Sequence, residues 1–289
     1  MILSLFLFLG GLIFGSFLNS LIYRIDSKEG FKGRSFCPKC KKTIKWYDNI
    51  PLVSFAFLGG RCRQCKKQIS IQYPTVELLT ALLFLLSGIL SDPGKVIYDW
   101  LNIIFNGNSS ESIQFPIIAI ISLILLLATC FLLLTIAIYD AKTKYVLTYY
   151  AYSAATIAFL FNLTEYFKDG GEWTLVNIFS YLVPFFLAAF IPAGLFWLIS
   201  SFSKEKFMGS GDADIALAIG LLVGWPLILT SYYFAFITGS IWGVFLLLTK
   251  RGTMKSEVPF GPFLIAGAFF GIFFGQQIID LYARIYLGL

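Results

Sequence analysis

Long runs of apolar residues without a charge limit what this chain can fold into more than any other feature. Residues 116–139, for example, contain no charged side chain, and about 20 apolar residues suffice for a helix to cross a bilayer. Only 13% of all residues are charged, against about 25% in soluble domains. These features exclude a disordered chain, a disulfide-rich secreted domain and a soluble enzyme. They predict an all-α polytopic membrane protein.

The apolar runs predict eight transmembrane helices. Their ranges are 1–23, 74–91, 116–139, 145–163, 174–201, 213–224, 226–249 and 260–284. The sixth is the shortest and follows a glycine-rich turn. A charged segment separates the first two helices, so we expect three parts: a first helix (1–23), a small cytoplasmic domain (24–73) and a helical membrane domain (74–289).

Basic residues predict the orientation of these helices, because cytoplasmic loops are enriched in Lys and Arg. Of the 22 Lys and Arg residues, 12 lie in 24–73. Seven more lie in loops predicted on the same side: 140–145, 202–212 and 250–258. The other side has three: Lys95, Lys168 and Arg284. We therefore expect segment 24–73 in the cytoplasm and both termini outside. Topology and anionic lipid account for the net charge of +6, so no nucleic-acid partner is expected.

Segment 24–73 contains two Cys-x-x-Cys pairs, Cys37/Cys40 and Cys62/Cys65. Two such pairs at this spacing are typical of a structural zinc site, in which four thiolates complete a tetrahedron and leave no open position for substrate. The alternatives are redox chemistry, free thiols or a pair of disulfides, and a reducing cytoplasm disfavours the disulfides. The pattern therefore predicts a zinc ion that organises the domain without catalysing a reaction.

Two aspartates at predicted helix ends are the candidate catalytic residues. Asp140 ends the third span and Asp212 opens the sixth, at similar predicted depth. Two carboxylates that share a proton can activate water and protonate a leaving amine, which is aspartyl-protease chemistry. The chain has no histidine, so serine–histidine and cysteine–histidine catalysis are excluded. Alternatively, Asp140 ends its helix in water beside Lys142 or Lys144, and Asp212 caps its helix.

Two further acids leave alternatives open. Asp214 lies two residues beyond Asp212 and should point away from it on a helix, so we expect it to be solvated or ion-paired. Glu77 lies near the start of the second span, where a carboxylate needs a partner. It is either half of a structural ion pair or part of a ligand site.

Several motifs occur in an order that matches a known family. They are Gly15-Ser16-Phe17-Leu18-Asn19, the two cysteine pairs, Trp46-Tyr47-Asp48-Asn49-Ile50-Pro51, Tyr73-Pro74-Thr75-Val76-Glu77, the first aspartate Asp140, Gly209-Ser210-Gly211-Asp212 and Pro259-Phe260-Gly261-Pro262. The chain resembles the type IV prepilin peptidases, bacterial membrane leader peptidases of the GxGD aspartyl class. The resemblance covers most of the chain.

The resemblance implies two activities in the bacterial cytoplasmic membrane. One cleaves the basic leader of type IV prepilins and pseudopilins after a glycine, with Asp140 and Asp212 as the catalytic pair facing the cytoplasm. The other methylates the new α-amino group with S-adenosylmethionine. It also implies that Cys37, Cys40, Cys62 and Cys65 hold the metal. Glu77, Asp48 and Asn49 are our candidates for contacts to the methyl donor.

Two departures from the family pattern concern the aspartates. Leu147 stands where the family often has proline, which predicts an altered loop rather than lost catalysis. Asp214 stands where the family often has lysine, which predicts a shifted pH optimum. Two alternatives are a zinc-stabilised scaffold without catalysis, and an intramembrane peptidase of the signal-peptide or presenilin type, which also carries Gly-x-Gly-Asp.

Overall fold

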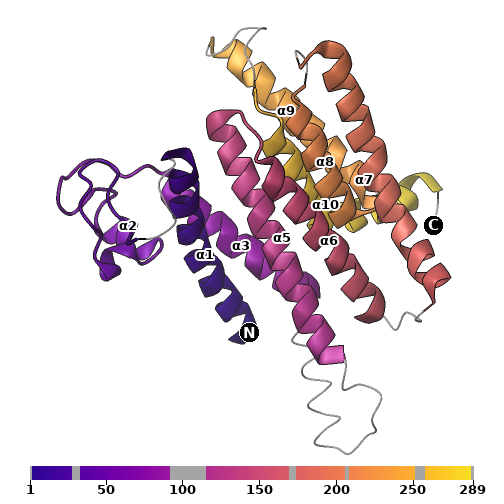
Figure 1. Ribbon diagram of the computed structural model, residues 1–289, viewed down its shortest axis with the longest axis horizontal. Helices are drawn as coiled ribbons and strands as arrows, with labels where there is room; N and C mark the ends of the chain where they lie inside the picture. Colours follow the sequence, from indigo (N-terminus) through magenta and orange to yellow (C-terminus); the bar gives the residue numbers. More distant parts are fainter. Residues whose placement is uncertain are drawn as a thin grey trace, which may run out of the picture. The chain divides into compact units, whose positions relative to one another are not determined.

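A computed structural model describes residues 2–27, 33–91, 115–168, 174–205, 208–250 and 258–287. The chain divides into two compact units, Met1–Lys95 and Val96–Leu289 (Figure 1). The described residues are helical apart from turns and two isolated β-bridges. The predicted all-α class is confirmed.

Two long helices form the frame of the first unit, α1 (Ile2–Ser27) and α3 (Gln72–Ser91). They run antiparallel, because Gly15 lies against Glu77 and Gly11 against Ala81. A Cβ on Gly11 would lie 2.5 Å from the Cα of Ala81, so only glycine permits this close contact between the two backbones. Asn19 completes the junction by donating a hydrogen bond to the carbonyl of Tyr73, at 3.2 Å.

Between α1 and α3, the described residues 33–71 contain little regular structure. It holds the short helices η1 (Trp46–Asn49) and α2 (Val53–Phe57). Isolated antiparallel bridges pair Phe36 with Thr43 and Arg61 with Gln68. Within 33–71, Cys37 is the only buried residue, so this small domain has almost no hydrophobic core.

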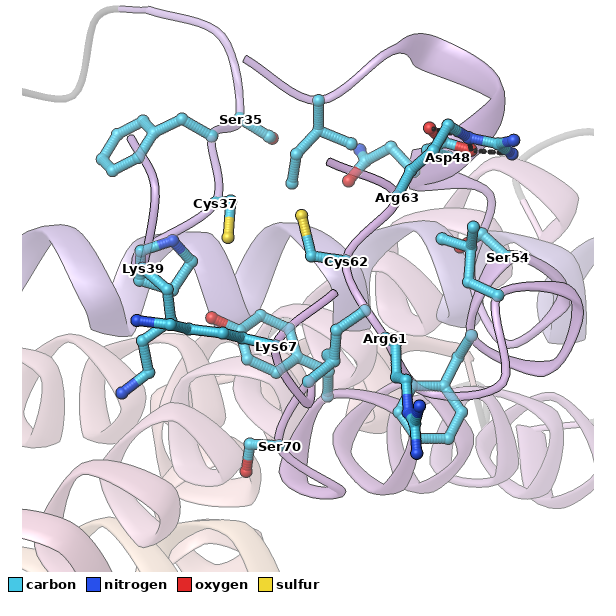
Figure 2. A pocket seen from close by; sticks show the side chains of 18 of the residues that line it. Ser35, Cys37, Lys39, Asp48, Ser54, Arg61, Cys62, Arg63, Lys67 and Ser70 are labelled. Atoms are coloured by element: carbon cyan, nitrogen blue, oxygen red, sulfur yellow. Dashed lines mark hydrogen bonds and ion pairs between the residues drawn. The ribbon is translucent and has the colours of Figure 1, made fainter. Parts of the chain in front are cut away.

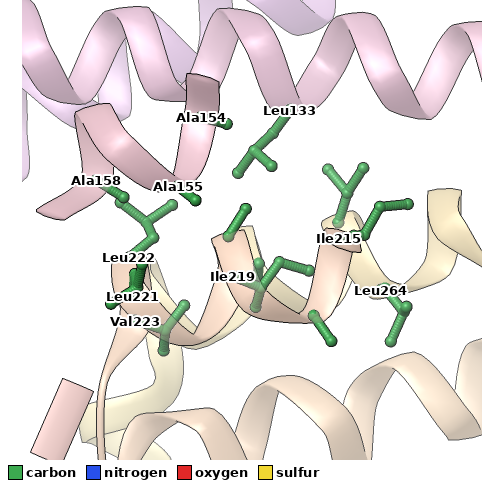
Figure 3. Packing of buried hydrophobic residues seen from close by; sticks show 14 of the residues in the cluster. Leu133, Ala154, Ala155, Ala158, Ile215, Ile219, Leu221, Leu222, Val223 and Leu264 are labelled. Carbon is green, nitrogen blue, oxygen red and sulfur yellow. The ribbon is translucent and has the colours of Figure 1, made fainter. Parts of the chain in front are cut away.

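The second unit is a helical bundle. Its helices are α5 (Phe115–Thr143), α6 (Thr148–Lys168), α7 (Leu175–Ser203), α8 (Ser210–Val223), α9 (Leu227–Leu248) and α10 (Gly261–Tyr282), followed by the final turn η2 (Ala283–Leu287). The short helix α8 packs against α6, α7 and α10 (Figure 1). Ile215 and Ile219 of α8 are fully buried within a cluster that includes Leu133 of α5 and Leu264 of α10 (Figure 3).

Small residues let α8 fit into this position. Ala154, Ala155 and Ala158 of α6 face it (Figure 3), and a Cβ on Gly220 would lie 2.2 Å from the Cα of Ala189 in α7. The bundle is therefore packed by close helix contacts.

The number of predicted spans is not confirmed. Six described helices are long and apolar enough to cross a membrane: α1, α3, α5, α7, α9 and α10. The predicted spans 145–163 and 213–224 do form helices, α6 and α8. However, α8 has only 14 residues, which at about 1.5 Å per residue is shorter than a bilayer core. The helix α6 is less apolar because it carries Tyr149, Tyr150, Tyr152, Asn162 and Glu165. The orientation of the helices stays a prediction.

Candidate functional sites

The four cysteines of the first unit come together as the sequence predicts. Their sulfur atoms all lie within 4.8 Å of one another, and those of Cys37 and Cys65 are 4.0 Å apart. In a tetrahedral site with zinc–sulfur bonds of about 2.3 Å, neighbouring sulfurs are about 3.8 Å apart. Figure 2 shows the sulfurs of Cys37 and Cys62 directed toward each other. The donor set and spacing therefore fit a metal ion.

Two similar turns position these thiols. The N–H of Cys37 donates to the carbonyl of Lys42 and the N–H of Cys62 donates to that of Lys67, each at 2.9 Å. In each turn the residue after the second cysteine, Lys41 or Lys66, has a φ near +60°. A non-glycine residue rarely adopts this conformation, so the turns resemble each other even where the geometry is unfavourable.

The thiols differ in acidity because of their surroundings. The pKa of Cys62 is lowered to about 7, chiefly by the backbone N–H of Cys65. At Cys65, a hydrogen bond from the backbone of Lys67 is outweighed by desolvation and the neighbouring thiols, and the pKa rises to about 11. One thiolate therefore forms easily and a second is costly, unless a cation is present to balance the charge.

The predicted methyl-donor residues line a single cavity. This cavity of about 810 Å³ lies beside the cysteines, and its lining includes Asp48, Asn49 and Glu77. Asp48 accepts hydrogen bonds from Arg63, whose Nη2 lies 2.7 Å from Oδ1 (Figure 2). This contact lowers the pKa of Asp48. The Asp48 carboxylate therefore forms an ion pair with Arg63 within the first unit.

Glu77 makes no ion pair with the residues that the structure describes, although an ion pair was one of its two interpretations. Its side chain is 6% exposed, and its Oε2 accepts a hydrogen bond from the N–H of Leu52 at 2.8 Å. It also accepts a bond from the side chain of Ser16. Because Leu52 has a φ of +59°, this hydrogen bond stabilises an uncommon backbone turn. Glu77 thus ties the cysteine domain to α3 while its side chain lines the cavity.

Asp140 and Asp212 lie close together in the second unit, near enough to interact electrostatically. Asp140 is in the last turn of α5 and is 3% exposed. This burial contradicts the alternative that it ends its helix in water. Its Oδ2 is buried and makes no hydrogen bond of standard geometry with another described residue. A buried polar oxygen without a partner is costly, and such strain is common at functional sites.

Asp212 lies in the first turn of α8 and is 7% exposed. The residue that caps α8 is Gly209, so the alternative in which Asp212 serves as the cap is wrong. The N–H of Gly209 interacts with the Asp212 carboxylate. A Cβ on Gly211 would lie 2.5 Å from the Cβ of Val146. Glycine is therefore required at Gly211 for α8 to approach the loop after α5.

Gly261 is a site residue whose role the sequence analysis did not assign. It begins α10, and its N–H is directed at the carboxylate of Asp140. A Cβ there would lie 2.5 Å from Oδ2 of Asp140 and 2.8 Å from Cδ1 of Ile215. The Pro259-Phe260-Gly261-Pro262 motif was the available signal, but nothing in the linear sequence links it to Asp140.

Asp214 points away from the pair, as the helical spacing predicts. It accepts a hydrogen bond from the hydroxyl of Tyr152 in α6 at 3.0 Å. Asp214 therefore belongs to the more exposed face of α8, and Asp212 to the buried one.

Comparison with known proteins agrees with this arrangement. Residues 9–90 match the family described as the bacterial peptidase A24 N-terminal domain, and residues 126–244 match the type IV leader peptidase family. A "Prepilin leader peptidase/N-methyltransferase" of Klebsiella pneumoniae is 32% identical over 227 residues, which is 76% of this chain and 85% of that protein. The chain belongs to the type IV leader peptidase family.

Two further members of the leader peptidase family match over most of their length. A "Prepilin leader peptidase/N-methyltransferase" of Bacillus subtilis is 27% identical, with 98% of each chain covered. A "Type 4 prepilin-like proteins leader peptide-processing enzyme" of Escherichia coli is 31% identical, with 89% of each chain covered. No solved structure matches the chain significantly.

These matches confirm the resemblance and the prediction of a membrane peptidase. The second family match contains both Asp140 and Asp212, and the first contains all four cysteines. Leader peptidase family membership also separates the chain from the signal-peptide or presenilin type of intramembrane peptidase.

Proposed function

We propose that this protein cleaves the leader of type IV prepilins or pseudopilins after a glycine, at the cytoplasmic face of the bacterial inner membrane. In the same proposal it then methylates the new α-amino group with S-adenosylmethionine. The observation that carries the proposal is the buried pair Asp140 and Asp212, which come from the ends of two different helices in a chain of the leader peptidase family.

The peptidase step follows from two adjacent carboxylates. The pair holds one proton, because two negative charges this close repel each other. The ionised carboxylate takes a proton from water, and the hydroxide attacks the glycyl carbonyl carbon. The protonated carboxylate stabilises the developing oxyanion and the pair then protonates the departing amine, so the carbon–nitrogen bond breaks. The interaction of Gly261 N–H with Asp140 orients one carboxylate for this work.

The methylation step belongs to the cysteine domain. S-adenosylmethionine would supply a methyl group on a positively charged sulfur. Asn49 would contact the donor directly, while Asp48 and Glu77, which already accept hydrogen bonds, would hold the cavity wall in place. A zinc ion on the four cysteines would fix the two turns that form the rest of this wall.

Intact mass spectrometry of a purified prepilin tests the proposal. The substrate is incubated with the protein and S-adenosylmethionine, and wild type is compared with Asp140→Asn, Asp212→Asn and Cys62→Ser. Asp214→Asn is the matched control, because it makes the same change two residues from Asp212.

We expect a leader-sized mass loss and one added methyl group with wild type and Asp214→Asn, and no cleavage with either pair variant. Cleavage that survives Asp140→Asn while Asp212→Asn abolishes it would rule out a shared pair. Intact substrate, with folded protein and several prepilins tried, would favour a zinc-stabilised scaffold instead.

A further inference from the structure

A groove runs along one face of α1. It is a hollow of about 470 Å³. The α1 residues that line it are Ile13, Ser16, Phe17, Ser20, Leu21 and Arg24, and the loop residues are Gly33, Ser35, Asn49 and Pro51. The α1 residues are spaced three and four positions apart, so they form one continuous stripe of the helix.

The chemistry of the stripe changes along the helix. Its first part is apolar and open, since Ile13 is 64% and Phe17 is 55% exposed. Ser16 and Ser20 follow, and Arg24 lies in the last turn of α1. Since α1 is long and apolar enough to cross a membrane, Ile13 and Phe17 lie at hydrocarbon depth and Arg24 at the lipid headgroups.

The polar end of this groove opens into a positively charged region. Ser16, Ser20, Arg24, Ser35 and Asn49 line both the groove and the 810 Å³ cavity of the cysteine domain. Seven Lys and Arg residues line that cavity against two acids: Arg24, Lys39, Lys42, Lys45, Arg61, Arg63 and Lys67 (Figure 2). Four thiolates around a divalent ion would carry a charge of −2, so positive charge would still exceed negative charge.

We propose that this groove binds one anionic phospholipid. The phosphate would lie among Arg24, Ser20 and Ser35, and one acyl chain would follow Phe17 and Ile13 toward the membrane centre. Arg24 donates a hydrogen bond to the carbonyl of Gly33 at 2.8 Å, which holds the guanidinium at the junction of groove and cavity. The combination of an apolar stripe, two hydroxyls and a cation in series matches a phospholipid better than it matches a free phosphate or an uncharged lipid.

The site would also couple the lipid to the cysteine domain. Four groove residues come from the loop that leads into and through that domain. A bound headgroup would therefore contact both α1 and the loop, and fix the position of Asn49 relative to the helix. This inference does not depend on the proposed peptidase or methyltransferase activity.

Native mass spectrometry of the full-length protein in detergent tests the inference. The probes are phosphatidylglycerol, phosphatidylcholine with the same acyl chains, and inorganic phosphate. Two variants address the two ends of the groove: Arg24→Gln removes the cation, and Ser20→Phe fills the middle. Lys66→Gln is the matched control, since this exposed lysine of the same domain lines neither hollow. Retained metal content and helical circular dichroism show that each variant is folded.

We expect one tightly bound phosphatidylglycerol, with phosphatidylcholine at least about tenfold weaker. Both lipids have a phosphate, but the choline cation of phosphatidylcholine would face the Lys and Arg residues that line the adjoining cavity. Arg24→Gln should remove this preference, Ser20→Phe should abolish binding of both lipids, and Lys66→Gln should leave both unchanged. Equal affinity for the two lipids, equal losses in Arg24→Gln and Lys66→Gln, or full competition by inorganic phosphate would overturn the proposal. Displacement of the lipid by a prepilin transmembrane segment would also overturn it and assign the groove to substrate.

Discussion

The cysteine domain and the helical bundle are held together by different forces. Within 33–71 only Cys37 is buried, and Trp46 and Phe57 are 80% and 88% exposed. In the bundle, α8 alone buries ten of its residues. Because a segment this short buries so little apolar surface, we propose that it depends on a metal for its fold. The bundle depends on packing.

This difference separates the two chemistries of the leader peptidase family. Asp140 and Asp212 are both buried among packed helices, which limit the movement of each carboxylate. Such restraint suits the acid–base catalysis that we propose for the pair. The cysteine domain offers a wide cavity beside the two turns that carry the cysteines. We therefore expect substitutions in the bundle and in the cysteine domain to impair different reactions.

The largest effect should come from the aspartate pair. Asp140→Asn or Asp212→Asn should lower prepilin cleavage by at least about 10³-fold, because an amide can neither accept the proton of water nor share one. Methylation of a peptide that is already cleaved should stay near the wild-type rate. Rates for both reactions from separate peptide assays check this. If either variant loses methylation as well, the two regions do not act independently.

Metal removal should affect the two reactions in the opposite way, with methylation lost and cleavage retained. Cys62→Ser or a chelator should release the metal, expose Lys and Arg residues of 33–71 to trypsin and abolish methylation. Cleavage by the bundle should persist. Metal analysis, limited digestion and the two activity assays measure these outcomes. Cys130→Ala serves as the control, because Cys130 is buried in α5 of the bundle; it should keep the metal. Equal trypsin sensitivity of the two variants would contradict the metal dependence of the cysteine domain.

Adding one methyl group at each of two glycines should distinguish the tightly packed aspartate site from a loosely packed part of the bundle. Gly261→Ala places a Cβ against Oδ2 of Asp140, and a shift of about 1 Å at a reacting group can cost about 10²-fold in rate. Gly243→Ala makes the same change in α9, where nothing lies within 4 Å of the new atom. Steady-state cleavage kinetics should show a fall in kcat for the first variant only. Similar rates for both variants would remove Gly261 from the site.

The sequence predicts local motifs better than it predicts contacts between residues that are far apart along the chain. It predicted that the four cysteines come together, because Cys-x-x-Cys spacing encodes the geometry of each pair within one turn. It also singled out Asp140 and Asp212, which the bundle brings close together, because charges at the ends of apolar runs are conspicuous. The catalytic and metal-binding roles of these residues stay predictions. It did not find the contact of Gly261 with Asp140 or the bond between Glu77 and Leu52. Those contacts depend on how separate helices and turns pack, which no local pattern specifies.

The prediction of eight spans is not confirmed for a related reason. Apolar runs predict helices, but a helix such as α8 can be apolar because other helices surround it rather than because it crosses lipid. The 14 residues of α8 and the complete burial of Ile215 and Ile219 fit this second case. Hydropathy alone does not separate the two environments.

Substitution of Glu77 would test how firmly the cysteine domain is attached to α3. Glu77→Ala removes the acceptor for the N–H of Leu52, and a lost hydrogen bond to a charged group costs about 1.5–3 kcal/mol. Hydrogen exchange at Leu52 should therefore accelerate by about tenfold or more. Glu77→Gln keeps an oxygen acceptor and should restore much of the protection. Unchanged exchange in Glu77→Ala would mean that the metal alone holds the Leu52 turn.

The smallest effect should come from the ion pair of Asp48 and Arg63. The guanidinium donates to both carboxylate oxygens, with Nε at 3.0 Å from Oδ1 and 2.9 Å from Oδ2. The pKa of Asp48 is lowered by this bond, so the pair stabilises the domain at neutral pH and the contribution is lost as the pH falls through that lowered pKa.

Arg63 is half exposed, and exposed pairs are worth about 0–1 kcal/mol. We therefore expect Asp48→Asn to change the thermal midpoint of the metal-bound domain only slightly at neutral pH, and by a still smaller amount in the mildest acid at which the thiolates hold the metal. Calorimetry at several pH values, with Lys66→Gln as a control outside the pair, measures this. A loss comparable to that of metal removal would mean that surface polar contacts, rather than the metal, hold the cysteine domain together.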